Sequence, residues 1–145
     1  LGPHADARVA RAARAYRAVV PATRAPLALQ FLDEDDAARG LLAAGMTMSC
    51  GVWNLATSDW LGAHAIARLV GGRVVRVPLR MLLLGSEIAF RAGALPFGAD
   101  RTCFLAGPLA LDPSLAEAAI GWKATRSSAD VLAPYGSQRY MRHVR

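Results

Sequence analysis

The sequence predicts an α/β fold that forms only part of a larger sheet. Short apolar runs of strand length alternate with longer amphipathic segments, which is the pattern of strands that alternate with helices. The chain has 145 residues, of which 54% are hydrophobic and 19% charged, so it can bury the core of one domain. Only three or four strand candidates are visible, fewer than a typical open sheet contains.

The first predicted element is a helix over residues 5–20, which Pro21 ends. One narrow stripe of this helix is apolar and consists of Val9, Ala13, Tyr16 and Val20. The opposite half carries Arg8, Arg11, Arg14 and Arg17. A solvated outer face is the favoured interpretation of these arginines, and a surface that binds polyanions is the alternative.

Residues 27–32 form an apolar run of strand length, and four acids, Asp33 to Asp36, follow it directly. We expect a helix over residues 37–44, with Asp35 or Asp36 as its N-cap and Gly45 as its left-handed stop. Adjacent carboxylates also suit acid–base chemistry or binding of a hard cation. Helix capping with solvated charge is the favoured interpretation.

The middle of the chain predicts two strands around a helix. Residues 51–56 resemble a second buried strand, and Thr57, Ser58 and Asp59 offer caps for a helix over residues 60–70. Gly71-Gly72 ends that helix. Residues 73–77 are rich in β-branched side chains and predict a short strand that ends at Pro78.

A helix is predicted over residues 79–92, with Gly93 as its stop, followed by a loop over residues 93–101. Residues 103–105 predict a brief strand. Asp112-Pro113-Ser114 is a strong helix start, and that helix runs to Ile120 and stops at Gly121. We expect Trp122 to fold back onto it, and residues 125–145 to form a loose polar tail.

Several kinds of site are absent from the sequence. There is no G-x-G-x-x-G or P-loop to hold a phosphate, no G-x-S-x-G elbow and no histidine pair at metal-ligand spacing. Cys50 and Cys103 lack a C-x-x-C pattern and are expected to be small buried hydrophobes. The net charge is +6, but all basic residues except Lys123 are arginines in an alanine-rich chain, so this bias alone does not indicate a nucleic-acid partner.

Four segments together resemble a known family. They are the N-terminal Leu-Gly-Pro, residues 29–40 (LQFLDEDDAARG), residues 51–56 (GVWNLA), and Leu111-Asp112-Pro113-Ser114 with the later Gly-Trp-Lys of residues 121–123. Their order and spacing are similar to the C-terminal half of the extended short-chain dehydrogenase/reductases, the NAD(P)-dependent epimerase/dehydratase group. Two positions depart from the family pattern: Asp33 replaces its usual histidine, and Leu29 stands where a basic residue often lies.

The resemblance implies that residues 1–128 are the substrate-binding half of a Rossmann-like enzyme: the last sheet strands with a small helical substrate domain. Residues 129–145 would be the tail. In this family the other half carries the glycine-rich dinucleotide loop and a Tyr-x-x-x-Lys pair, neither of which is present here. NAD or NADP would therefore bind the missing N-terminal half of the parent enzyme, and we expect this chain alone to bind neither and to have no turnover.

Five residues follow from this comparison as candidates. Phe31, Trp60 and Arg101 would position a small-molecule substrate, and Asp36 and Asn54 would hold the scaffold. The parent reaction would transfer a hydride to or from a carbonyl or hydroxyl carbon, with the cofactor supplying the chemistry. A nucleotide sugar, a steroid and an aldehyde-like compound all remain candidate substrates.

Two other functions stay open. The chain is either an arginine-rich binding module, whose affinity would fall steeply with salt, or a partner subunit without catalysis, whose open sheet edge needs a complementary chain or a second copy in a homodimer. We expect no nucleic-acid partner, no membrane span and a cytoplasmic location, because no apolar run approaches the roughly 20 residues of a span.

Overall fold

The computed structural model describes residues 19–22, 26–48 and 50–136 of the chain, which form a mixed α/β structure. Two strand pairs run parallel. In the first, β1 (Val19–Ala22) pairs with β3 (Arg73–Arg76), and in the second, β2 (Ala28–Leu29) pairs with β4 (Pro108–Leu109). An antiparallel bridge joins Leu29 to Leu61 on the other edge of β2.

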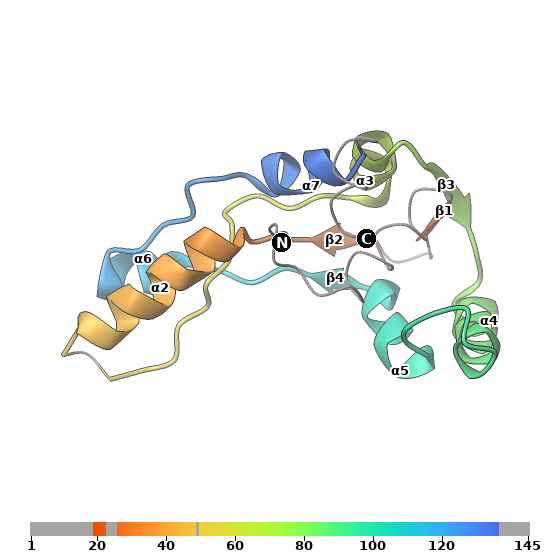
Figure 1. The fold of residues 1–145 in the computed structure, drawn as a ribbon, viewed down its shortest axis with the longest axis horizontal. Coiled ribbons are helices and arrows are strands. Elements are labelled where there is room, and N and C mark those ends of the chain that lie inside the picture. Colours follow the sequence, from red (N-terminus) through yellow and green to blue (C-terminus); the bar gives the residue numbers. More distant parts are fainter. Residues whose placement is uncertain (1–18, 23–25, 49, 137–145) are drawn as a thin grey trace.

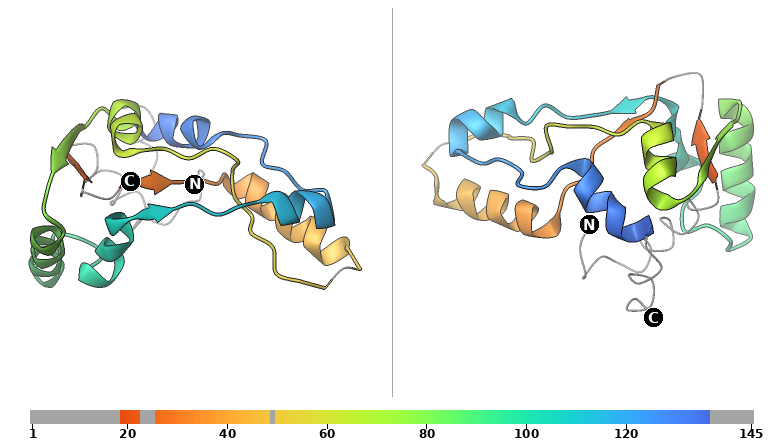
Figure 2. Two further views of the ribbon diagram at one scale, coloured as in Figure 1. Left: turned by 180° about the vertical axis from the view of Figure 1, so that it is seen from behind. Right: turned by 90° about the horizontal axis from the view of Figure 1, so that it is seen from above.

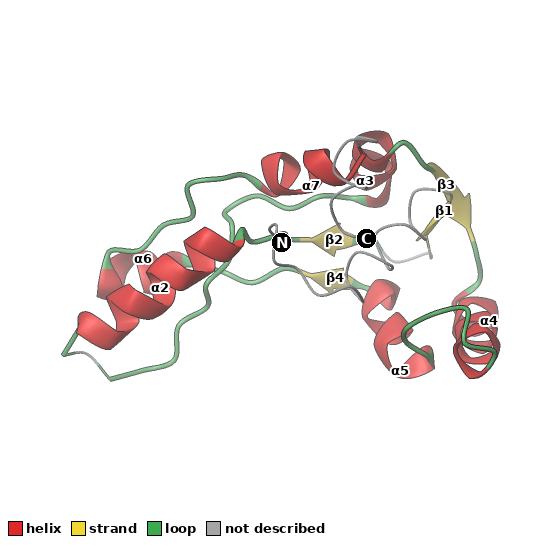
Figure 3. Cartoon of the chain, viewed as in Figure 1, coloured by secondary structure: helices red, strands yellow, loops and turns green. Residues whose placement is uncertain are grey.

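The molecule is elongated, and the helices occupy three places along it (Figures 1 and 3). Helices α2 (Glu34–Met46) and α6 (Ser114–Ile120) lie at one end. The opposite end holds α4 (Leu79–Arg91) and the short α5 (Ala99–Thr102). Between the two ends, α3 and α7 lie close to each other, beside β2 (Figure 2).

The core forms where α3 (Ala63–Val70) packs against α7 (Ser128–Gly136) and the start of β2. Apolar residues of α3 recur at helical spacing, so one face of the helix is buried while Arg68 stays exposed. Partly buried Phe31 and Val74 pack against the cluster. Its buried members are Leu27, Leu61, Ile66, Ala67, Val70 and Leu132.

Several predicted elements are confirmed. Helix α4 and strand β3 match the predictions for residues 79–92 and 73–77 closely. Gly71 and Gly121 end α3 and α6 in the left-handed conformation (φ 71° and 64°), which glycine adopts without steric cost. Gly93, which follows α4, also has a positive φ.

The end of the helix predicted over residues 5–20 is wrong. Residues 1–18 lie outside the described part of the chain, and Val19–Ala22 is a strand. The reason is tertiary pairing: Val20 and Pro21 lie opposite Val74 and Val75 in a parallel ladder. Valine is β-branched and favours strands over helices.

The boundaries of α2 differ from the prediction at both ends. Asp33, not Asp35 or Asp36, is the N-cap, because its Oδ1 accepts a hydrogen bond from the Asp35 amide (3.1 Å). Gly45 lies inside the helix, which continues to Met46 and has the extended Thr47 as its C-cap. Glycine is permitted but not required to stop a helix, and Gly45 has no positive φ.

One predicted strand is shorter than expected, and another is absent from the described chain. The run over residues 27–32 contributes only Ala28–Leu29, and residues 51–56 belong to no strand pair in the described chain. Residues 60–62 are likewise not helical: Leu61 forms the bridge to Leu29, and α3 begins after Gly62 without a side-chain cap.

The C-terminal third contains more structure than predicted. Residues 103–105 are not a strand but belong to a 3₁₀ turn, η1 (Cys103–Ala106), and the strand that follows is Pro108–Leu109. Residues 128–136, expected to lie in a loose tail, form α7 with Val131, Leu132 and Tyr135 buried. Residues 137–145 lie outside the described part of the chain.

Candidate functional site

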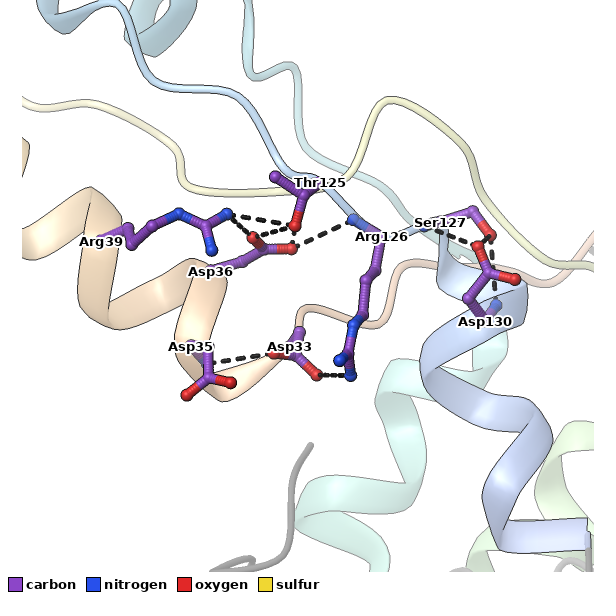
Figure 4. Close-up of polar contacts among 8 residues, drawn as sticks. All are labelled: Asp33, Asp35, Asp36, Arg39, Thr125, Arg126, Ser127 and Asp130. Atoms are coloured by element: carbon purple, nitrogen blue, oxygen red, sulfur yellow. Dashed lines mark hydrogen bonds and ion pairs between the residues drawn. The ribbon is translucent and has the colours of Figure 1, made fainter.

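The most densely bonded side chain of the predicted set is Asp36, in the first turn of α2. It is only 1% exposed. Thr125 donates to its carboxylate twice, from the backbone amide (3.0 Å) and from Oγ1 (2.8 Å), and the Arg126 amide adds a third hydrogen bond (3.2 Å). Arg39, one turn along α2, forms an ion pair with it (Figure 4). The carboxylate therefore ties α2 to a segment 89 residues away.

The ionised state of Asp36 is favoured. Burial opposes ionisation, but the hydrogen bonds from Thr125 and Arg126 and the charge of Arg39 outweigh it, so the pKa of Asp36 lies below its ordinary value. A carboxylate that is held ionised and has its oxygens occupied is suited to holding structure. It is poorly suited to accept a proton from a substrate.

Trp122 also bonds Asp36, and we call the contacts of residues 122–126 with Asp36 the Asp36 junction. The indole Nε1 of Trp122 donates to the carbonyl oxygen of Asp36 (2.9 Å), and its main-chain amide faces the carbonyl of Ala116 on α6 (3.4 Å). We predicted that Trp122 folds back onto α6, and it bridges α6 to α2. A Cβ built on Gly40 would lie 2.6 Å from Leu55 and 3.0 Å from the indole nitrogen, so any larger residue here requires the Leu55 side chain to shift.

Asp33 is also committed to structure. Besides capping α2, it accepts from Arg126 Nη1 (3.0 Å), and it is buried (Figure 4). Within the acidic run Asp33 to Asp36, Asp33 therefore caps α2 and Asp36 forms the Asp36 junction. Among the residues that the structure describes, no group of three His, Cys, Asp or Glu residues is placed to hold a metal ion.

A second polar junction was missed by sequence reasoning. The Gln30 side chain donates to the Thr57 carbonyl (2.6 Å) and accepts from the Leu111 amide (2.6 Å), so it links β2 to two later segments. Thr57 Oγ1 lies 2.7 Å from Ser128 Oγ, and both side chains are buried. The Phe31 amide donates to the same serine oxygen (3.1 Å).

Asp59 caps a helix other than the one expected. Its carboxylate accepts from the Ser128 amide (2.9 and 3.1 Å), at the start of α7 rather than of α3. Ser127 and Asp130 add a capping box, in which Ser127 Oγ lies 2.6 Å from Asp130 Oδ2 and accepts from the Asp130 amide. This S-x-x-D spacing is a helix-start signal, and it was the clue by which α7 was predictable.

The predicted substrate residues fall in two places. Phe31 lies two residues after Leu29, and Trp60 lies one residue before Leu61. Because Leu29 and Leu61 form an antiparallel bridge, both residues lie at the same end of it. Phe31 is partly buried against the core, whereas Trp60 is 60% exposed. Arg101 lies exposed on α5, and its guanidinium forms no hydrogen bond or ion pair with another described residue.

Asn54 lies in the unpaired segment 51–56. Its side-chain amide donates to the carbonyl of Asp112 (3.3 Å), just before α6. Asp112 in turn accepts from the Ser114 amide (2.9 Å), which is the capping bond predicted for this helix, although Pro113 precedes the first helical residue instead of being it. Cys50 and Cys103 are both exposed rather than buried as expected.

No protein-family profile, curated protein or solved structure matches this chain. Within the described residues, no helix has both the length and the apolar character needed to cross a membrane.

Proposed function

We propose that this chain is the substrate-binding part of an NAD(P)-dependent epimerase/dehydratase or reductase of the extended short-chain dehydrogenase/reductase type. The substrate would carry the carbonyl or hydroxyl group to which or from which hydride moves. The dinucleotide and the proton-transfer residues would belong to a separate N-terminal half, so the chain alone would bind substrate weakly and turn nothing over.

One observation supports this proposal more than any other. The segments that carry the resemblance lie far apart in sequence, yet side-chain bonds connect them: the Trp122 indole donates to the Asp36 carbonyl, and the Asn54 amide donates to the Asp112 carbonyl. Motifs that serve one fold are expected to meet in space.

The candidate substrate surface is assigned to Phe31 and Trp60. Both aromatic residues lie within two positions of the bridge between Leu29 and Leu61, with Phe31 packed against the core and Trp60 exposed. Rings of this kind offer an apolar wall to a steroid or an aldehyde-like compound, and they stack on a nucleotide base. Arg101 would bind an anionic group if the substrate has one, because its guanidinium has no partner among the described residues.

The cofactor cannot be assigned to residues of this chain. The sequence contains no glycine-rich phosphate cradle, and its only lysine, Lys123, lacks the tyrosine four residues earlier that the family uses. We therefore derive no catalytic step here. The contribution of this chain is to shape and orient the substrate next to a nicotinamide held elsewhere.

The decisive experiment begins with the coding DNA upstream of Leu1. The proposal expects, in the same frame or in an adjacent gene, a glycine-rich strand–turn–helix and a Tyr-x-x-x-Lys sequence. The two halves are then produced together and NAD(P)H turnover is measured with a nucleotide sugar, a ketosteroid and an aldehyde. A reading frame that starts just before Leu1, with no neighbouring dinucleotide-binding half, contradicts the proposal.

Variants of the assembled enzyme test the residue assignments. We expect Trp60→Ala and Arg101→Ala to raise KM or lower kcat/KM, whereas Arg68→Ala, an exposed arginine on α3, serves as the matched control. Unchanged kinetics in both test variants would remove these two residues from the substrate site. For the isolated chain, saturable quenching of tryptophan fluorescence by NADH or NADPH would show that the cofactor assignment is wrong.

A further inference from the structure

Helix α4 carries an apolar stripe on its exposed side. Met81, Leu84 and Ile88, which we call the α4 stripe, recur at helical spacing and are 66%, 63% and 60% exposed. Another side of the helix is used for packing, since α4 contacts α5, and Glu87 accepts a hydrogen bond from the Ala99 amide (3.2 Å). The stripe is therefore an apolar surface that the described chain leaves largely open to solvent.

Two arginines flank the α4 stripe on one side. Arg80 and Arg91 are both exposed and lie eleven residues apart, close to three helical turns, so they are aligned along the helix beside Leu84. The Arg80 guanidinium forms no hydrogen bond or ion pair with another described residue. Arg91 pairs with Glu87 (2.9 Å), but exposed pairs of this kind contribute little. The charges of both arginines remain accessible to an external anion.

The charges of the described chain are separated in space. Residues 73–101, which form β3, α4 and α5, contain five arginines and two acids, a net charge of +3. The other described residues contain eight acids and four bases, a net charge of −4. Figure 1 shows α4 and α5 at the end of the molecule opposite α2, whose first turn is acidic. The α4 stripe thus lies on the cationic end.

We propose that the α4 stripe docks on an anionic lipid bilayer, as a peripheral contact and independently of the function proposed above. The helix would lie in the plane of the surface, with the stripe inserted among the acyl chains and Arg80 and Arg91 at the level of the lipid phosphates. The net negative charge of the other described residues would direct them away from the same surface. Charge separation therefore gives the docked chain one orientation.

The composition of the stripe favours a bilayer over a protein partner. Its three side chains are aliphatic, and none of them carries a hydrogen-bonding group. Protein interfaces concentrate their binding energy in aromatic and arginine anchors that fill pockets, whereas fluid hydrocarbon accepts any apolar side chain.

The acidic end of a second copy is a poorer match for the arginines of α4. Asp33 and Asp36 are buried, and both are already paired inside the chain with Arg126 and Arg39. Contact between unlike ends also does not close into a dimer, so it would extend from copy to copy. Lipid phosphates, in contrast, present an uninterrupted layer of accessible anions.

Sedimentation of the full chain with lipid vesicles tests this proposal. The two vesicle types are phosphatidylcholine alone and phosphatidylcholine mixed with phosphatidylglycerol, which is anionic. We expect binding to the mixed vesicles that weakens as salt is added, and binding to the neutral vesicles that is at least about tenfold weaker. Hydrogen exchange of the amides of α4 should slow when the mixed vesicles are present.

Matched variants locate the contact. Ile88→Asp should weaken binding to the mixed vesicles at least about tenfold, whereas Leu115→Asp, at a 65% exposed position of α6, should bind like the natural chain. Arg80→Glu should also weaken binding, with Arg68→Glu on α3 as its control. Circular dichroism verifies that each variant is folded.

Three outcomes overturn the proposal. The first is equal binding, or none, to the two vesicle types. The second is binding to the mixed vesicles that Ile88→Asp and Arg80→Glu both leave unchanged, which would place the lipid contact elsewhere in the chain. The third is an oligomer in lipid-free solution, measured by light scattering, that Ile88→Asp dissociates, because the α4 stripe would then be covered by a second copy.

Discussion

The Trp122 indole donates to the main-chain carbonyl of Asp36, the residue whose carboxylate holds the segment just after Trp122. The indole donates to the Asp36 carbonyl, and the residues that follow Trp122 donate to its carboxylate. Main chain and side chain of one residue are thus bonded to the same late segment, which fixes both the position and the rotation of the first turn of α2.

Replacing this carboxylate is expected to destabilise the chain. Asp36→Asn removes the ion pair with Arg39 and presents an NH₂ group to amides that need an acceptor, so we expect a loss of about 2–3 kcal/mol in the free energy of unfolding. Urea denaturation measures it. Asp35→Asn, one residue earlier and exposed, is the control and should change stability little. Equal losses in the two variants would contradict the role assigned to Asp36.

The same carboxylate predicts how stability depends on pH. The pKa of Asp36 is lower in the folded chain than in the unfolded chain, so its contribution is complete above the unfolded pKa. That contribution is lost as the pH falls from the ordinary range of aspartate through the lowered pKa. We expect the natural chain to lose more stability on acidification than Asp36→Asn does. Parallel pH profiles of the two proteins would show that this linkage is absent.

Two glycines of α2 should respond oppositely to alanine. Gly40→Ala places a methyl group against Leu55 and Trp122, with a cost of about 1–3 kcal/mol. Gly45→Ala meets no atom within 4 Å and should stabilise the helix by about 0.5–1 kcal/mol. Thermal unfolding of both variants gives the comparison. A stabilised Gly40→Ala would show that Leu55 does not pack there.

The start of α7 depends on Asp59. Asp59→Ala removes the acceptor of the Ser128 amide and should lower the free energy of unfolding by about 1 kcal/mol. The neighbouring exposed residue provides the control, Ser58→Ala, which should have no measurable effect. Hydrogen exchange should locate the change in residues 128–136. Faster exchange confined to α3 instead would support the sequence-based expectation that Asp59 caps that helix.

Local signals predicted the elements whose structure is decided locally. The helix of residues 79–92, the strand of residues 73–77 and the glycine stops at Gly71 and Gly121 all depend on neighbouring residues, and each is confirmed. Val19-Val20 and residues 51–56 depend on the presence or absence of a partner strand, which no local pattern reveals. Aspartate is a residue type that commonly caps helices, but the helix that Asp59 caps, α7, begins 69 residues later.

The residues of the candidate site also divide into those that the sequence indicates and those that only the fold reveals. The family resemblance singled out Asp36 and Asn54, although not their partners Thr125 and Asp112. Gln30 and Ser128 carried no signal of their own, since their importance comes from bonds to residues 27 to 97 positions away. The positions of Phe31 and Trp60 beside one bridge follow from the pairing of Leu29 with Leu61, which only the fold reveals.

The long separation between Asp36 and residues 122–126 also constrains how the chain acquires its structure during synthesis. A ribosome that has made α2 has not yet made the residues that donate hydrogen bonds to its buried carboxylate, nor the tryptophan that lies against Gly40. Contacts this distant in sequence slow folding, and they leave the early segments solvated until the end. A chain that ends before Trp122 would therefore lack the hydrogen bonds that hold the first turn of α2.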